Sequence, residues 1–306
     1  MLESIVTYSG VSRRPWMVFV WGFIISSVAI LVSTQLWFHV SVSGISVNLT
    51  GIFSVLFTII PSIFFVTMLI RKEEDAEEKD IKRHYHETQF WERHVRDFMI
   101  FLFFFAGVTL AFAFWYLILP GVWGGVFGTE IAAKDAFVVQ VSKINQMRGM
   151  TGAATGLSPY FSPILTNNLN VMMFSFIFSF IFGAGAVFII VWNASILGVA
   201  IAKDARHIFD IPTLSSLYVM HGVPEIAAYV SAALAGGLIS AAIIRRHGSD
   251  ILGRVVIDAT FILMFSVFSV VCGALIEAST GAIFWGATIL WWGGFVYLLL
   301  RFFLKW

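Results

Sequence analysis

Long apolar runs without a single charged residue are the feature that most limits what this chain can fold into. Seven such runs recur along its 306 residues, each near the length of about 20 residues that an α-helix needs to cross a bilayer core. Only 12% of the residues are charged, roughly half the fraction of an ordinary soluble domain. We therefore predict an all-α, polytopic transmembrane helical bundle with spans at residues 17–37, 50–70, 98–120, 171–202, 226–244, 259–276 and 282–300.

Other membrane architectures fit the sequence less well. Strands of a transmembrane barrel alternate apolar and polar residues over about ten positions, whereas these runs are continuously apolar. Arg13 and Arg14 precede the first run, as in a signal peptide, but the run is too long for one, and we expect it to be a retained helix. The single cysteine, Cys272, excludes a disulfide framework and a cysteine metal site.

The sequence indicates which membrane face carries the N-terminus less clearly than it indicates the spans themselves. Lysine and arginine divide almost evenly between the two sides of a seven-span arrangement, so the positive-inside rule favours a cytoplasmic N-terminus only slightly. A re-entrant hairpin over residues 211–244 would strengthen that bias and leave six spans. However, a helix over residues 226–244 rises about 28 Å and can cross the bilayer completely. Seven spans are therefore the first choice, with six spans plus a re-entrant hairpin as the alternative.

Charge is concentrated between the second and third spans and suggests three parts. Residues 1–70 form an N-terminal two-span membrane extension, residues 71–97 a charged helical connector, and residues 98–306 a five-span core. The connector mixes both signs, which is typical of an exposed helix with ion pairs along its surface. A docking site for a soluble partner is the alternative interpretation.

Small residues recur at a spacing of four along the fifth span. Such a stripe lets another helix approach closely, because helices in lipid associate by packing rather than by a hydrophobic drive. The run at 171–202 carries similar residues and is too long for one crossing, which indicates a tilt or a kink near its glycines. The stripes could serve internal packing or a symmetric homodimer. On the fifth span they comprise Ala228, Ala232, Gly236 and Ser240.

The pentapeptide His-Gly-Val-Pro-Glu at 221–225 stands at the expected start of the fifth span. There Pro224 suits the first helical position, Glu225 complements the helix dipole, and Gly222 lets the chain turn. His221 and Glu225 remain to be explained, as does Glu277, which ends a polar face of the sixth span. Ionisable residues at membrane depth cost about 2.5–3.5 kcal/mol each on insertion scales, so they tend to pair, line cavities or carry ions. We predict that these three meet in an intramembrane polar cluster.

The cluster does not have the spacing of a known catalytic metal motif. One histidine and two carboxylates could ligate a divalent ion, and a metal-dependent intramembrane hydrolase is one reading, but the two-histidine zincin arrangement is missing. The sequence also lacks a phosphate-binding glycine loop with a lysine, a nucleophile elbow and a basic face for nucleic acid. We therefore predict no catalytic residue, no metal, no cofactor and no nucleic-acid partner.

Several short motifs, taken in order, resemble the stage II sporulation protein M family over roughly residues 98–306. They are Asn167-Asn168 before an apolar helix, the region from Asn193 to Gly198, the His-Gly-x-Pro-Glu element, Gly236-Gly237, and Ile276-Glu277-Ala278. The first two predicted spans and the connector go beyond the shorter family pattern. The resemblance carries over residue by residue to Asn168, His221, Gly222, Pro224, Glu225 and Glu277.

That resemblance implies a non-enzymatic membrane component. Members from sporulating bacteria anchor a complex with peptidoglycan-degrading partners during engulfment. We accordingly expect a multi-pass scaffold or assembly factor of the cell (plasma) membrane, with the lipid bilayer and membrane or cell-envelope proteins as partners, and a possible homodimer. The alternative is a transporter or ion or proton channel that uses the polar cluster.

Two further patterns predict peripheral features. Residues 129–151 mix apolar and charged side chains and indicate an amphipathic helix that either covers the bundle or forms a partner surface. Tryptophans near the span ends are typical of interfacial anchors. They are Trp16, Trp37, Trp115, Trp291, Trp292 and Trp306.

Overall fold

The fold was obtained as a computed structural model and is all-α apart from two short antiparallel ribbons in the part of the chain it describes. This confirms the predicted fold class. The described residues are 16–36, 39–42, 45–64, 88–119, 123–124, 130–131, 133–148, 159–182, 186–246 and 248–303.

The N-terminal part contains three apolar helices and both ribbons. Helix α3 spans Trp16–Leu36, a shorter helix spans Thr50–Phe64, and α5 spans Thr88–Ile118. One ribbon pairs β1 (His39–Val42) with β2 (Ile45–Asn48), and the other pairs β3 (Trp123–Gly124) with β4 (Glu130–Ile131).

The C-terminal part continues with η1 and α6, a 3-10 turn and helix that precede five long helices. The elements are η1 (Ala133–Phe137), α6 (Val138–Arg148), α7 (Phe161–Phe182), α8 (Ala186–Asp204), η2 (Ile208–Asp210), α9 (Ile211–Ile244), α10 (Ser249–Ala278) and α11 (Gly281–Phe303).

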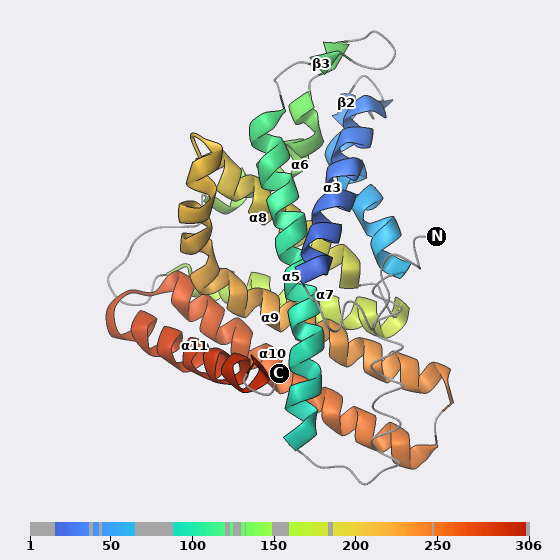
Figure 1. The fold of residues 1–306 in the computed structure, drawn as a ribbon, viewed down its shortest axis with the longest axis vertical. Coiled ribbons are helices and arrows are strands. Elements are labelled where there is room, and N and C mark those ends of the chain that lie inside the picture. The colour runs from blue at the N-terminus through green and yellow to red at the C-terminus, as the bar shows by residue number, and fades with distance from the viewer. Residues whose placement is uncertain are drawn as a thin grey trace.

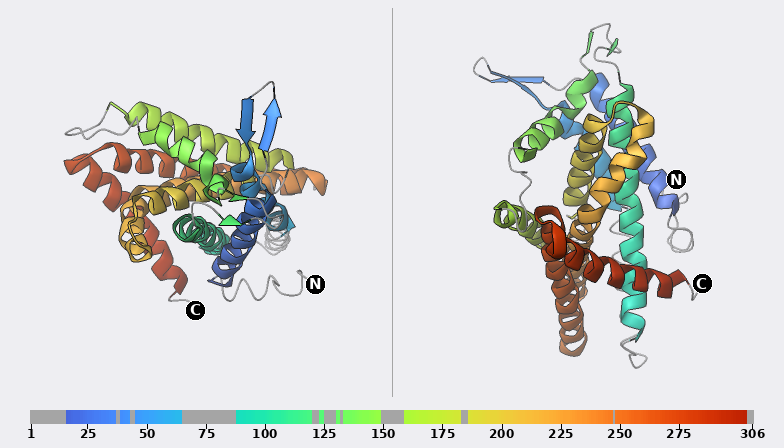
Figure 2. Two further views of the ribbon diagram at one scale, coloured as in Figure 1. Left: turned by 90° about the horizontal axis from the view of Figure 1, so that it is seen from above. Right: turned by 90° about the vertical axis from the view of Figure 1, so that its left-hand side faces the viewer.

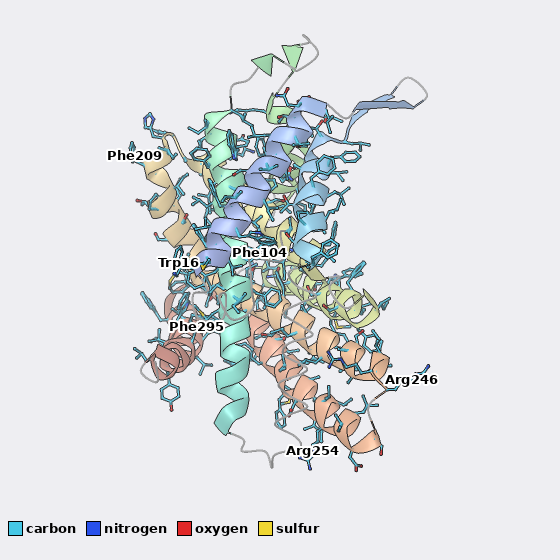
Figure 3. The ribbon with its side chains drawn as sticks, turned by 45° about the vertical axis from the view of Figure 1, so that its right-hand side comes forward. Trp16, Phe104, Phe209, Arg246, Arg254 and Phe295 are labelled. Carbon is cyan, nitrogen blue, oxygen red and sulfur yellow. The ribbon has the colours of Figure 1, made fainter. Side chains whose placement is uncertain are left out.

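Helix α5 runs the length of the bundle and connects its two halves (Figure 1). Helices α3 and α8 pack along it in one half, while α9 packs along α7 and α10 in the other. Helix α11 crosses the lower part of the bundle at a steep angle to α5 (Figure 2). Figure 3 places Phe209 and Arg246 at opposite ends of the molecule, just before and just after α9, so this helix spans the distance between them.

Six helices within the described ranges are long and apolar enough to cross a membrane. They lie at Trp16–Leu36, Phe98–Ile118, Phe161–Ile181, Val187–Asp204, Tyr218–Ile244 and Ser249–Ala278. The total differs from the predicted seven. The expected spans at 50–70 and 282–300 are not among the six, although helices lie at Thr50–Phe64 and Gly281–Phe303.

The predicted fourth span is two helices rather than one. Helix α7 ends at Phe182 and α8 begins at Ala186. A single straight helix of 32 residues would rise about 48 Å, well beyond the apolar thickness of a bilayer. Residues 183–185 themselves lie outside the described ranges.

The re-entrant alternative for residues 211–244 is wrong. Helix α9 runs without interruption over all 34 of these residues and does not turn back. Its apolar continuity explains the result, because the segment before the pentapeptide contains no charged residue that would end a helix at a membrane surface.

Close backbone contacts confirm that the small-residue stripe packs inside the protein. A Cβ atom on Gly236 would overlap the carbonyl oxygen of Phe176 in α7, and Ala228 and Ala232 are completely buried. Small residues permit this approach of two helix backbones. The stripe therefore serves contacts within the chain.

The segment predicted as an amphipathic helix covers the bundle. Phe137, Gln140 and Ile144 from η1 and α6 are buried, and the Gln140 Nε2 atom donates at 3.4 Å to both the Gly51 carbonyl oxygen and Ser195 Oγ. These bonds join the Thr50–Phe64 helix to α8. Most of the predicted charged connector, residues 71–87, lies outside the described ranges, and its end forms the start of α5.

Candidate functional site

The pentapeptide at 221–225 lies inside α9, not at its start. The helix begins at Ile211 and Pro212 occupies its first turn, so Pro212 takes the place that was predicted for Pro224. The predicted helix entry is therefore wrong, and with it the roles assigned there to Gly222 as a turn and Glu225 as a partner of the helix dipole. Pro224 is a buried proline within a helix.

An interior proline leaves one backbone carbonyl without its helical partner. Pro224 has no N–H to donate, so the carbonyl oxygen of Met220, four residues earlier, must bind elsewhere. Trp292 of α11 supplies the bond, with its Nε1 atom donating to the Met220 oxygen at 3.1 Å. A neighbouring helix thus satisfies the group that the proline frees, as membrane proteins require.

Trp291 and Trp292 are packing residues that bind neighbouring helices, and their predicted role as interfacial anchors stays a prediction. Trp291 is only 2% exposed, and its Nε1 atom donates to Ser269 Oγ in α10 at 2.9 Å. Together the two side chains fix α11 against both α9 and α10. Trp16, by contrast, is exposed, while Trp37 and Trp306 lie outside the described residues.

A hydrogen-bond network centred on Asn168 joins α7 to α9. Asn168 donates from Nδ2 to Glu225 Oε1 at 2.6 Å, and its Oδ1 atom accepts from the Tyr229 hydroxyl at 3.0 Å. Asn167 also donates to Asn168 Oδ1, at 3.1 Å. Asn168 is 5% exposed, and both of its contacts to α9 cross between helices. The network therefore ties two spans together at membrane depth.

Glu277 of α10 brings a third helix to this network. Its carboxyl group lies within hydrogen-bonding range of Glu225 and interacts electrostatically with His221. The approach is possible because α10 has Gly273 at the contact, where an added Cβ would lie 2.8 Å from Glu225 Cγ. The structure thus brings His221, Glu225 and Glu277 together.

The network lines a cavity of about 590 Å³ whose walls come from helices α5 to α10. This volume lies within the range of roughly 300–1,000 Å³ that is typical of small-molecule sites. Asn193 lines it from α8, although its Nδ2 atom donates to Ile189 O within the same helix at 2.8 Å. Gly222 also lines it, and no described atom lies within 4 Å of the position that a Cβ would take there.

Three polar residues of the cavity were not predicted from the sequence. Tyr229 follows Glu225 by four positions, so it shares a helix face with His221 and Glu225 and could have been found from that spacing. Asp204 and Tyr218 form the outer end, where the Tyr218 hydroxyl donates to Asp204 Oδ2 at 2.9 Å. No sequence pattern pairs these two, because α8 and α9 meet only in the folded chain.

Within the described residues, no group of three or more His, Cys, Asp or Glu side chains is arranged to hold a metal ion. The polar cluster therefore consists of hydrogen bonds and close carboxyl and imidazole groups. Such an arrangement can join helices, bind a polar ligand or hold a proton.

Comparison with known proteins places the chain in a family. The family model described as Stage II sporulation protein M matches residues 98–280, which include α7 to α10 and every residue of the polar cluster. No curated protein and no solved structure matches the chain. Because the match covers more than half of the sequence, this membrane protein belongs to the stage II sporulation protein M family.

Proposed function

We propose that this protein is a non-catalytic integral membrane scaffold or assembly factor that holds other membrane proteins in a complex. Family membership supports this role, since it is the one that the sequence resemblance implied. The single observation that carries the proposal is the network in which Asn168 joins Glu225 and Tyr229 while Glu277 approaches from α10.

A scaffold needs a rigid arrangement of its helices. Helices in lipid gain little from burying apolar side chains against each other, so specific packing and polar contacts decide their arrangement. In this protein, specific packing and polar contacts both hold α7, α9 and α10 together. Trp292 attaches α11 to them by donating to the backbone carbonyl that Pro224 frees. A platform for partners needs such a fixed arrangement, because partner surfaces must keep their relative positions.

The location and partners belong to the same proposal. We place the protein in the cell (plasma) membrane, in contact with membrane or cell-envelope proteins. A homodimer is compatible with this role, but the stripe around Gly236 is used inside the protomer and is not the dimer surface. Crosslinking of the full chain in membranes, read by the mass of the crosslinked species, tests the dimer.

Partner recovery from intact membranes tests the scaffold role. Tagged full-length protein is crosslinked in its native cells, and associated membrane proteins are quantified for wild type, Glu225→Ala and Glu225→Gln. We expect loss of partners in Glu225→Ala, which cannot accept the Asn168 bond, and retention in Glu225→Gln, which can. Equal recovery in all three, with all three folded, contradicts the proposal.

Transport is the second candidate, and the cavity is the observation that favours it. It lies at membrane depth and brings two carboxyl groups and a histidine together, as sites for ions or protons do. Purified protein in liposomes decides between the two roles. Flux of protons or cations that is lost in Glu225→Gln supports transport and contradicts a purely structural role, while the scaffold proposal expects no flux.

A further inference from the structure

A second, apolar cavity shares a wall with the polar one. It has a volume of about 190 Å³, lies between α5, α8 and α9, and is lined almost entirely by aliphatic and aromatic side chains. This volume is too small for a complete small-molecule site, whose usual lower limit is roughly 300 Å³. Five residues line both cavities: Phe105, Leu197, Tyr218, Gly222 and Ile226.

Gly222 lies at this junction and leaves it open. Glycine is unfavourable inside a helix compared with alanine. At Gly107, Gly198 and Gly236 the neighbouring helix explains its presence, because a Cβ atom would overlap a backbone oxygen there. At Gly222 no described atom lies within 4 Å of such a Cβ. A larger side chain at position 222 would fill the open space between the cavities.

The polar cavity has a clear charge preference. Its lining includes the carboxyl groups of Asp204, Glu225 and Glu277, and none of its described lining residues is lysine or arginine. Carboxylates accept hydrogen bonds and attract positive charge, and they repel phosphate. A head group bearing an amine fits this lining, whereas a phosphate head group does not.

We propose that the two cavities form one binding site for an amphiphile with an amine head group and an apolar chain. The amine occupies the polar cavity near Glu225 and Glu277, and the chain passes over Gly222 into the apolar cavity. This site goes beyond the scaffold role and does not depend on it, since a scaffold needs no ligand and either proposal can fail while the other stands.

Binding of three probes with the same chain tests the site. Dodecylamine, dodecanol and dodecyl phosphate are added separately to full-length protein in detergent, and bound adducts are measured by native mass spectrometry. We expect dodecylamine to bind at least about tenfold more tightly than dodecyl phosphate, because charge-assisted hydrogen bonds to carboxylates are the stronger kind. Equal binding of all three, or a preference for the phosphate, overturns the proposal, since it indicates non-specific association.

Two substitutions at one position locate the site. Gly222→Leu fills the junction and is expected to reduce dodecylamine affinity by at least about tenfold, whereas Gly222→Ala, its matched control, leaves the passage open. Equal affinity in both variants overturns the proposal. If Gly222→Leu does not fold, Glu225→Gln is the deciding variant. Its affinity for dodecylamine relative to dodecanol is expected to fall. An unchanged ratio of the two affinities overturns the assignment of the head group.

Discussion

The two halves of α9 are held in place by different means. After Pro224, the helix packs through small residues, so that Gly236 lies against the backbone of α7 and Ala228 and Ala232 are fully buried. Around Pro224, the same helix borders two cavities and reaches its neighbours through side chains, as Glu225 does with Asn168.

The difference shows how one membrane helix combines rigidity with space for a ligand. Where backbones touch, small residues suffice and nothing further fits between the helices. Where the helices diverge, polar side chains bridge the gap, and their hydrogen bonds maintain an open cavity instead of a packed contact. The glycines of α9 mark the two cases, with Gly236 closed in by α7 and Gly222 open.

The largest expected effect comes from one substitution made at both glycines. Gly236→Ala places a Cβ against the Phe176 carbonyl oxygen and should destabilise the protein by about 3 kcal/mol, because two backbones must separate. Gly222→Ala meets no described atom and should stabilise it by about 0.5–1 kcal/mol through helix propensity. Thermal unfolding in detergent measures both. Effects of the same sign would remove the distinction between the two halves.

The next largest effect on stability is expected from removing Asn168, the centre of the polar network. Asn168→Ala leaves the Glu225 carboxyl and the Tyr229 hydroxyl without their partner, and we expect a loss of about 1–2 kcal/mol. Asn193→Ala is the matched control, because Asn193 bonds only within its own helix among the contacts described. Chemical denaturation compares the two, and an equal loss from both would show that the network does not join the helices.

A double-mutant cycle tests how α11 compensates for the helix proline. Trp292→Phe keeps the ring but removes the donor to the Met220 carbonyl oxygen, which should cost about 1 kcal/mol. In a Pro224→Ala background the residue at 224 regains its N–H and can bond that oxygen, so the same change should cost much less. Additive effects in the stability assay would mean that the tryptophan and the proline are independent.

The smallest effect concerns the start of α9, outside its membrane span. The backbone N–H groups of His207 and Arg206 donate to Asp210 Oδ2, each at 2.9 Å, and lower the pKa of this carboxyl from its usual 3.8. A lowered pKa stabilises the folded state above pH 3.8, and that contribution is lost as the pH falls through the folded value. Asp210→Asn should make the free energy of unfolding depend less on pH below pH 3.8. The packing of the two halves of α9 should not change. An identical profile in this variant would contradict the assignment.

The bundle itself could be predicted from the sequence, as could part of the cluster. Continuous apolar runs leave only helices as spanning elements, and small residues four apart mark the face of α9 that meets α7. The meeting of His221 and Glu225 with Glu277 follows from the packing of α9 against α10, although His221 and Glu225 lie inside α9 and not at its start. Whether that cluster binds an ion or only joins helices stays a prediction.

The sequence misled where one local pattern has two structural meanings. A proline near an apolar run is typical of a helix start, but it can also lie in a helix interior where a neighbouring group binds the carbonyl it frees, as Trp292 does for Pro224. The division of the fourth predicted span was missed for a related reason, since the continuous run at 171–202 does not reveal that α7 ends at Phe182. A cavity such as the one beside Gly222 has no sequence signal, because it consists of space that several helices leave unfilled.

Cysteine accessibility tests the central claim most directly, because the chain has a single native cysteine, Cys272, which is 3% exposed. In a Cys272→Ser background, Gly222→Cys is compared with Ala232→Cys, a fully buried position on the same helix. We predict that a small cationic thiol reagent labels position 222, at least about tenfold faster than an anionic one, and leaves position 232 unlabelled. Equal labelling at both positions, or none at 222, would contradict an open, carboxyl-lined cavity beside Gly222.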